Sequence, residues 1–189
     1  MKKLVDGYEV FLKRADRELY GNLCGGQWPH TLVIGCSDSR VIPEEIFSAK
    51  PGDLFVIRNV GNICRMDEPS VAAAVEYAVC HLHVDSIAIL AHADCGAVKA
   101  AGDLGSVPEP GILKWLGEEK YKGATIEEAV KKWGIKQKER LDDFPLIKDA
   151  TEGGALQTIL LYFDLASLRL EHFSNGKWRK AMEEKENNA

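Results

Sequence analysis

Residues 31–40 read Thr-Leu-Val-Ile-Gly-Cys-Ser-Asp-Ser-Arg, so an apolar run passes directly into polar side chains. A short run that is apolar at successive positions is typical of a strand buried on both faces of a parallel sheet. Runs of the same kind occur at residues 54–58, 86–91 and 156–163. Together with residues 31–35, these segments predict the buried strands of one sheet.

The segments between these runs have the apolar spacing of helices, with Gly and Pro at their boundaries. Helices that alternate with apolar strands predict an α/β fold, a mainly parallel β-sheet flanked by helices. We expect residues 1–189 to form a single domain, with a helical arm over 1–25 and a charged, frayed tail over 177–189. The predicted helices are 5–19, 43–47, 68–82, 97–101, 112–116, 126–133 and 135–143, with a loop at 103–111 and an edge strand at 168–173.

The composition is that of an ordinary globular protein, with 46% hydrophobic and 28% charged residues. A formal charge of −5 provides no general attraction to nucleic acid or to an anionic membrane. No run of about eighteen apolar residues is present, so we expect no membrane span. Residues 1–11 lack the apolar stretch of a signal peptide, and five cysteines, an odd number, argue against a disulfide framework. We therefore expect a cytoplasmic protein with reduced thiols.

Metal-binding residue types stand where two of the predicted strands end. Cys36 directly follows the first strand, and His92 directly follows the third. The carboxyl ends of parallel strands meet at one edge of a sheet, and Cys95, three residues after His92, can face the same point. Two thiolates and an imidazole suit zinc, and three protein ligands leave a position open for catalysis. These residues predict a catalytic zinc ion.

Asp38 and Arg40 follow Cys36 at intervals of two residues, so in extended backbone all three side chains point the same way. A carboxylate beside a metal site needs a partner to stay ionised and oriented, and a guanidinium provides two parallel hydrogen bonds. Asp38 could then accept a hydrogen bond from a zinc-bound hydroxide. We interpret Asp38 and Arg40 as catalytic residues.

Two plainer interpretations stay open. Cys64 also follows a predicted strand, and as a fourth ligand it would make the zinc site structural. Asp38 could instead cap the helix that follows it. A dinucleotide-binding domain is disfavoured, because no Gly-x-Gly-x-x-Gly follows the first strand.

The sequence resembles the β-class carbonic anhydrases, and in particular the short archaeal and bacterial type. The matching stretches are Cys-Ser-Asp-Ser-Arg at 36–40, Arg-Asn-Val-Gly-Asn at 58–62, Glu-Tyr-Ala-Val at 76–79 and His-Ala-Asp-Cys-Gly-Ala at 92–97. A weaker likeness runs through 113–116 and 137–145, so the resemblance covers nearly the whole chain.

The resemblance implies that Cys36, His92 and Cys95 bind one zinc ion per subunit and that Asp38 and Arg40 form the catalytic dyad. It implies reversible hydration of carbon dioxide to bicarbonate and a proton, by attack of zinc-bound hydroxide. The expected assembly is a homodimer or a higher homo-oligomer, in which the N-terminal helix packs on a partner subunit. If Arg40 released Asp38, this carboxylate could itself fill the fourth zinc position.

Residues 161–167 depart from the family pattern. Members often carry an aromatic-Asp-x-x-x-Gly hairpin, and here the turn glycine is absent. No clear set of residues for the bicarbonate regulatory site of some members is present either. Relatives of this fold hydrolyse carbonyl sulfide or carbon disulfide with the same zinc chemistry, so these substrates are one alternative to carbon dioxide and bicarbonate. A non-catalytic zinc-binding module, with the fourth position filled, is a second alternative.

Overall fold

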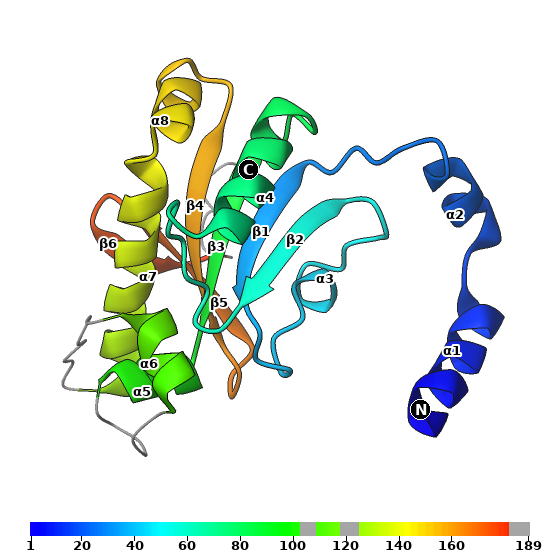
Figure 1. Ribbon diagram of the computed structural model, residues 1–189, viewed down its shortest axis with the longest axis horizontal. Coiled ribbons are helices and arrows are strands. Elements are labelled where there is room, and N and C mark those ends of the chain that lie inside the picture. The colour runs from blue at the N-terminus through cyan, green and yellow to red at the C-terminus, as the bar shows by residue number, and fades with distance from the viewer. Residues whose placement is uncertain (103–108, 118–124, 182–189) are drawn as a thin grey trace.

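The computed structural model describes residues 1–102, 109–117 and 125–181. Within them, one six-stranded sheet has the order β2-β1-β3-β4-β5-β6 (Figure 1). The first four strands of this order are parallel, β5 runs antiparallel to β4, and β6 runs antiparallel to β5. The predicted α/β class is therefore confirmed. The strands are β1 (Thr31–Cys36), β2 (Leu54–Asn59), β3 (Ser86–His92), β4 (Gln157–Asp164), β5 (Arg169–Ser174) and β6 (Lys177–Lys180).

Alternate residues of the parallel strands enter two separate apolar clusters, one on each face of the sheet. Leu32 and Ile34 pack among residues of α4 and α7, whereas Val33 lies in a smaller cluster with residues near α3. None of the helices in the described residues is long and apolar enough to cross a membrane. The helices are α1 (Lys2–Arg14), α2 (Arg17–Leu23), α3 (Pro43–Ile46), α4 (Pro69–Cys80), α5 (Gly96–Ala101), α6 (Pro110–Leu116), α7 (Ile126–Asp142) and α8 (Pro145–Glu152).

The N-terminal arm contains two helices, so the prediction of one helix over 5–19 is wrong. Ala15 has extended backbone dihedral angles, and the side chain of Asp16 accepts hydrogen bonds from two backbone N–H groups of α2. Asp16 is therefore an N-cap that starts a new helix. Neither helix contains a buried residue, and Figure 1 shows the arm extending away from the sheet.

α7 is continuous through Gly134, where the sequence predicts a break between two helices. A Cβ atom at this position would lie 3.0 Å from Cδ1 of Leu160 and 3.4 Å from Cβ of Ala91. Gly134 is thus the point where α7 approaches the sheet most tightly, and it does not end the helix. α8, which begins with Pro145 in its first turn, was not predicted.

The C-terminal region is more ordered than the sequence predicts. Lys177–Lys180 form β6 instead of a frayed tail, and β5 is therefore an internal strand instead of an edge. Trp178 accounts for this order, because its ring packs 5.3 Å from that of Phe173 and 6.1 Å from that of Tyr162, measured between centroids. Tail residues 182–189 lie outside the described residues, as do 103–108 of the predicted loop, and α6 begins at Pro110.

The hairpin between β4 and β5 forms without the turn glycine. Leu168 takes the left-handed conformation, with φ of 56°, which is costly for a leucine. The carboxylate of Asp164 stabilises the turn by accepting hydrogen bonds from Ala166 N–H at 3.0 Å and from the Ser167 hydroxyl at 2.8 Å.

Candidate metal centre

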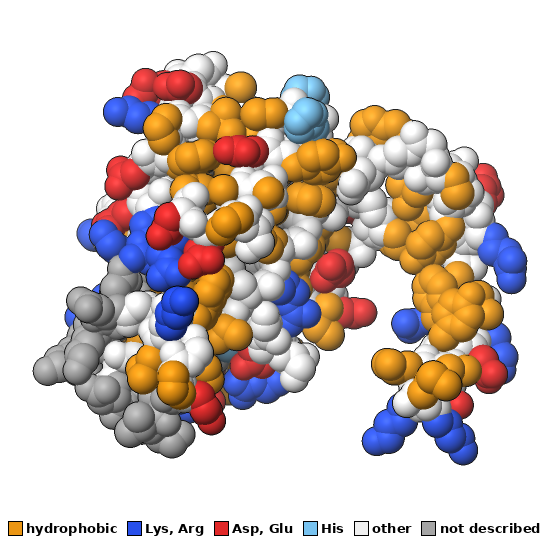
Figure 2. Space-filling view, in the orientation of Figure 1, with side chains coloured by type: hydrophobic (Ala, Val, Ile, Leu, Met, Phe, Trp, Pro, Cys, Tyr) orange, Lys and Arg blue, Asp and Glu red, His pale blue; other side chains and the backbone are white. Residues whose placement is uncertain are grey.

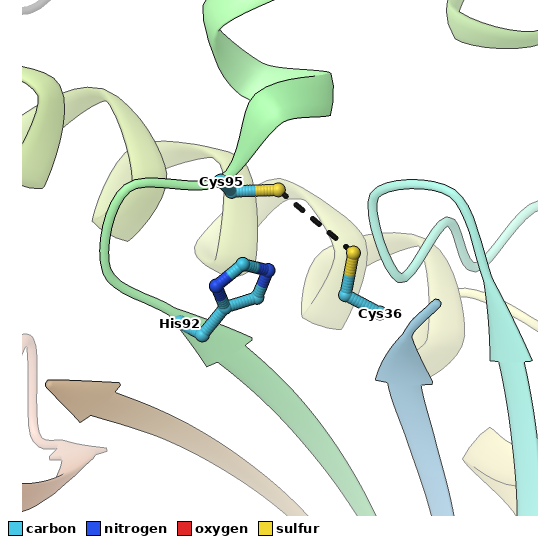
Figure 3. A group of neighbouring side chains, drawn as sticks. All are labelled: Cys36, His92 and Cys95. Atoms are coloured by element: carbon cyan, nitrogen blue, oxygen red, sulfur yellow. Dashed lines mark hydrogen bonds between the residues drawn. The ribbon is translucent and has the colours of Figure 1, made fainter. Parts of the chain in front are cut away.

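The structure brings Cys36, His92 and Cys95 together at one edge of the sheet. Cys36 ends β1 and His92 ends β3, and these strands are parallel neighbours. Cys95 is the N-cap of α5, directly after the short loop that follows β3. All three side chains are buried, and their candidate ligand atoms lie within 4.8 Å of one another. Figure 3 shows the three side chains converging from two strand ends and a helix start.

The geometry of this cluster fits a tetrahedral zinc ion. The two sulfur atoms are 4.0 Å apart, close to the about 3.8 Å expected for two thiolates that each lie about 2.3 Å from one tetrahedral zinc. His92 Nδ1 donates a hydrogen bond to the carbonyl of Ala93 at 2.9 Å, which leaves the Nε2 lone pair free. Nε2 is buried without a hydrogen-bond partner. Such an orphaned buried acceptor needs an explanation, and a metal ion provides one.

The pKa values of the two thiols, Cys36 and Cys95, are shifted in opposite directions. The pKa of Cys36 is lowered to about 4, chiefly because the Cys95 thiol donates a hydrogen bond to its sulfur, with the backbone N–H of Gly61 adding to the effect. The pKa of Cys95 is raised by the same interaction and by burial. A cation that binds both sulfurs would therefore displace one proton, that of Cys95.

Cys64 is not a member of this group in the described part of the chain. It packs in the apolar cluster of Leu32 and Val71, and burial raises the pKa of its thiol to about 12. The geometry thus gives no support to a four-ligand structural site that includes Cys64.

Asp38 and Arg40 lie beside the ligand cluster and form a bidentate pair. Arg40 donates from Nε to Oδ1 at 2.9 Å and from Nη2 to Oδ2 at 2.7 Å, and its backbone N–H donates to Oδ1 at 3.0 Å. This pairing holds the pKa of Asp38 well below its usual range. Oδ2 of Asp38 is also 4.0 Å from His92 Nε2, so the carboxylate faces the cluster.

The backbone reaches this arrangement through a turn, and the prediction of extended backbone from Cys36 to Arg40 is wrong. Val41 N–H donates to the carbonyl of Asp38 at 3.0 Å, which folds the chain back after the strand. Asp38 also does not cap the next helix, because the N-cap of α3 is Ile42. The carboxylate is therefore available to the site.

Arg58 is a further residue of the site, although no role for it is predicted from the sequence. It lies on β2 beside Gly35, and it donates from Nε to the carbonyl of Cys36 at 3.0 Å and from Nη2 to the carbonyl of Asp38 at 2.7 Å. The guanidinium thus clamps the backbone that carries both a candidate ligand and the carboxylate. Its position at the end of a strand was the available signal.

The loop after β2 supplies a hydrogen bond to one sulfur. Gly61 N–H donates to Cys36 Sγ at 3.4 Å. Gly61 has φ of 84°, and a Cβ atom there would lie 3.0 Å from that of Ala97, so glycine suits this position. Trp133 Nε1 donates to the carbonyl of Gly61 at 2.7 Å, and Trp115 Nε1 donates to that of Val60 at 2.7 Å. The two tryptophans therefore hold the loop against the site.

Comparison with known proteins identifies the class. Residues 31–170 match the family model described as carbonic anhydrase. Together with the mostly parallel sheet, this match shows that the chain belongs to the carbonic anhydrase family, in its β class, whose enzymes are carbonate dehydratases.

Particular relatives agree with this assignment. The chain is 34% identical to the carbonic anhydrase of Pseudomonas aeruginosa over 190 residues, which cover 90% of this chain and 86% of that enzyme. The solved structure of the β-carbonic anhydrase CcaA superposes with a TM-score of 0.88 at 30% identity, covering 96% of this chain and 92% of that one. A structure of the tetrameric β-carbonic anhydrases of Sordaria macrospora gives a TM-score of 0.75 at 26% identity, with 94% of each chain covered.

Proposed function

We propose that this chain catalyses the reversible hydration of carbon dioxide to bicarbonate and a proton at one zinc ion held by Cys36, His92 and Cys95. A single observation carries the proposal: two buried sulfurs and an unpartnered imidazole nitrogen converge beside an arginine-bound carboxylate. Membership of the β-class family supports the reaction. Zinc in this site would supply hydroxide near neutral pH, since the metal lowers the pKa of water from about 15.7 to about 7.

The residues of the chain orient the reaction. Asp38 accepts a hydrogen bond from the nucleophile's O–H and so directs an oxygen lone pair at the carbon of the substrate. Arg40 keeps Asp38 ionised and aimed through two parallel hydrogen bonds. The apolar side chains of Ile63 and Val98 pack in the same cluster as the two cysteines and exclude water from around the sulfurs.

The resting position of Asp38 follows from its contacts. Its two carboxylate oxygens are both engaged by Arg40, and only 17% of the Asp38 side chain is exposed. This geometry supports a state in which Asp38 stays with Arg40 and leaves the fourth metal position to water. It does not support a state in which Asp38 fills that position.

The test is carbon dioxide hydration by the zinc-loaded protein, followed by stopped-flow spectroscopy, for the wild type and for Asp38→Ala. We expect the variant to lose at least about 100-fold in kcat, the low end for loss of a residue that directs a proton, with zinc content unchanged. Asp149→Ala, on the exposed surface of α8, is the matched control and should keep the full rate. A full rate in Asp38→Ala would remove the role given to this carboxylate.

The same zinc-loaded protein samples also test which substrate the enzyme prefers. Release of sulfide from carbonyl sulfide or carbon disulfide is measured in parallel, and we expect hydration of carbon dioxide to dominate. The comparisons give no support to the sulfide-releasing alternative or to a non-catalytic zinc module. Efficient sulfide release without hydration would reverse the assignment, and zinc binding without either activity would favour the non-catalytic module.

We also propose that the chain forms a homodimer or a higher homo-oligomer and resides in the cytoplasm. The exposed apolar side chains of α1 support the assembly, with Leu4 80% and Tyr8 57% exposed, as does the similarity to enzymes described as tetrameric. Five cysteines without a disulfide suit a reducing compartment. Fractionation of cells that express the protein tests the location.

A further inference from the structure

Four side chains of alternating charge form a line at the rim of the candidate site. Asp38 is bound by Arg40, and Nη1 of Arg40 lies 3.7 Å from Oδ2 of Asp94. The other carboxylate oxygen of Asp94 is in contact with Nζ of Lys99. The line therefore joins the segment that follows Cys36, the last residue of β1, to the segment around Cys95, the N-cap of α5.

Arg40 has two carboxylates within reach but is bonded to only one of them. Its two bonds to Asp38 measure 2.7 and 2.9 Å, whereas 3.7 Å to Asp94 is too long for a hydrogen bond. The Arg40 side chain is 51% exposed, so packing does not hold it in place. A second carboxylate at 3.7 Å can therefore compete with Asp38 for the guanidinium.

Lys99 neutralises the charge of this competing carboxylate, Asp94. It lies on α5, one turn after Cys95, and its ammonium group pairs with Oδ1 of Asp94. The ion pairs of the described residues include two cations near Asp94, Arg40 and Lys99. Without Lys99, Asp94 would have Arg40 as its remaining partner in this set, and the attraction between them would compete with the Asp38 pair.

We propose that Lys99 is a positioning residue, which acts through Asp94 by neutralising this carboxylate so that Arg40 keeps both of its bonds to Asp38. The inference rests on the proposed function, in which Asp38 directs the nucleophile. The backbone N–H of Lys99 donates the ordinary helical hydrogen bond to the carbonyl of Cys95 at 3.0 Å, but among the described residues the Lys99 side chain makes its ion pair with Asp94 and none with the candidate ligands or Asp38. Its influence on the reaction is therefore indirect.

The primary test measures Arg40 without using the reaction. Exchange of its Nε–H with solvent, followed by ¹⁵N NMR on the full-length zinc protein at pH 6.5, reports how often the bond to Asp38 opens. Exposed ion pairs contribute little individually, so we expect Lys99→Ala to accelerate this exchange about two- to fivefold. Lys99→Arg, which keeps the charge, should restore the wild-type exchange.

A second substitution separates competition by Asp94 from a merely structural effect. Asp94→Asn removes the competing charge and suits the positive φ of 59° at this position. If Lys99 acts through Asp94, the double variant Asp94→Asn/Lys99→Ala should return exchange to the wild-type rate. Lys136→Ala, which removes a surface pair with Glu139 at 3.5 Å, is the matched control and should change nothing.

Each result of these experiments either supports or overturns the role proposed for Lys99. Unchanged exchange in Lys99→Ala, or equally fast exchange in the double variant, would overturn the proposal. The kcat for carbon dioxide hydration should fall in Lys99→Ala by no more than the same factor and recover in the double variant. Inactivity of the wild type would contradict the proposed function, while the exchange results would still report whether Lys99 positions Arg40.

Discussion

Arg58 differs from Asp38 and Arg40 because its side chain donates hydrogen bonds to backbone carbonyls. Its two bonds are to the carbonyls of Cys36 and Asp38, so it fixes the path of the segment that carries a candidate ligand and the carboxylate. Outer partners of this kind orient metal ligands, and their loss commonly weakens metal binding or activity about 10- to 100-fold.

We therefore predict that Arg58→Ala weakens zinc binding about 10- to 100-fold while the protein stays folded. Two carbonyl oxygens lose their partners, and the turn that presents Asp38 loosens as a result. Competition with a chromophoric chelator measures the affinity, and circular dichroism checks the fold. Arg179→Ala, on the exposed strand β6, is the control with unchanged affinity. Equal affinities in both variants would refute the clamp.

The two thiols make a further prediction about protons. Because the pKa of Cys36 is about 4, it is already a thiolate at pH 7, whereas the raised pKa of Cys95 keeps this thiol protonated. Zinc binding at pH 7 should therefore release about one proton from the pair, and apparent affinity should rise about tenfold per pH unit between about pH 6 and 8. Affinity falls as pH falls because protons compete for Cys95.

Calorimetry in buffers of different ionisation enthalpy measures the protons released. Cys64→Ser is the control, since this thiol lies outside the metal-capable group, and it should give the same stoichiometry. At pH 6, where water on the metal would stay largely un-ionised, release of about two protons would mean that both thiols are protonated before the metal binds, contrary to the lowered pKa of Cys36.

At the scale of secondary-structure elements, α7 connects the site to the sheet. Its Trp133 holds the loop of Gly61, and its Gly134 allows the helix to approach Leu160 and Ala91 closely. The roles of Trp133 and Gly134 are linked, because moving α7 away from the sheet would also move the Trp133 indole away from the loop of Gly61.

We predict that Gly134→Ala destabilises the protein by about 1 kcal/mol, because overpacking of about 1–3 kcal/mol outweighs the gain in helix propensity. Urea unfolding measures the change. Gly111→Ala in α6 is the matched control: its added Cβ would meet no atom within 4 Å, and it should be neutral or stabilising. A stabilised Gly134→Ala would show that the sheet can yield at Leu160.

At the scale of the whole molecule, the N-terminal arm is the part least supported by the rest of the chain. α1 has no buried residue, although apolar side chains such as Leu4 and Tyr8 lie on it. Figure 2 shows hydrophobic side chains over the arm, and Figure 1 shows that it projects from the body. Phe11 of α1 contacts Tyr20 of α2, but the exposed apolar side chains of α1, such as Leu4 and Tyr8, suit a contact with a second copy.

We predict that Leu4→Asp/Tyr8→Asp lowers the oligomeric state by disrupting this contact, since charges at a buried apolar interface are costly. Sedimentation velocity of the wild type and the variant measures the change. Lys3→Gln/Lys13→Gln on the same helix, which lowers the net charge by the same amount, is the control and should keep the wild-type oligomeric state. A wild-type protein that sediments as a monomer would contradict the proposed assembly.

The sequence by itself determined the four parallel strands and the candidate ligands. Strand segments such as 31–35 can be predicted because a strand that is buried on both faces needs an unbroken apolar run. Cys36 and His92 each directly follow such a segment. The tertiary structure alone decided which distant groups meet. Arg58 and Trp133 act on carbonyls 20 to 72 positions away, and such bonds leave no local pattern. The continuity of α7 through Gly134 and the order of β6 depend on packing against other elements, because a glycine or a charged segment has no fixed conformation of its own.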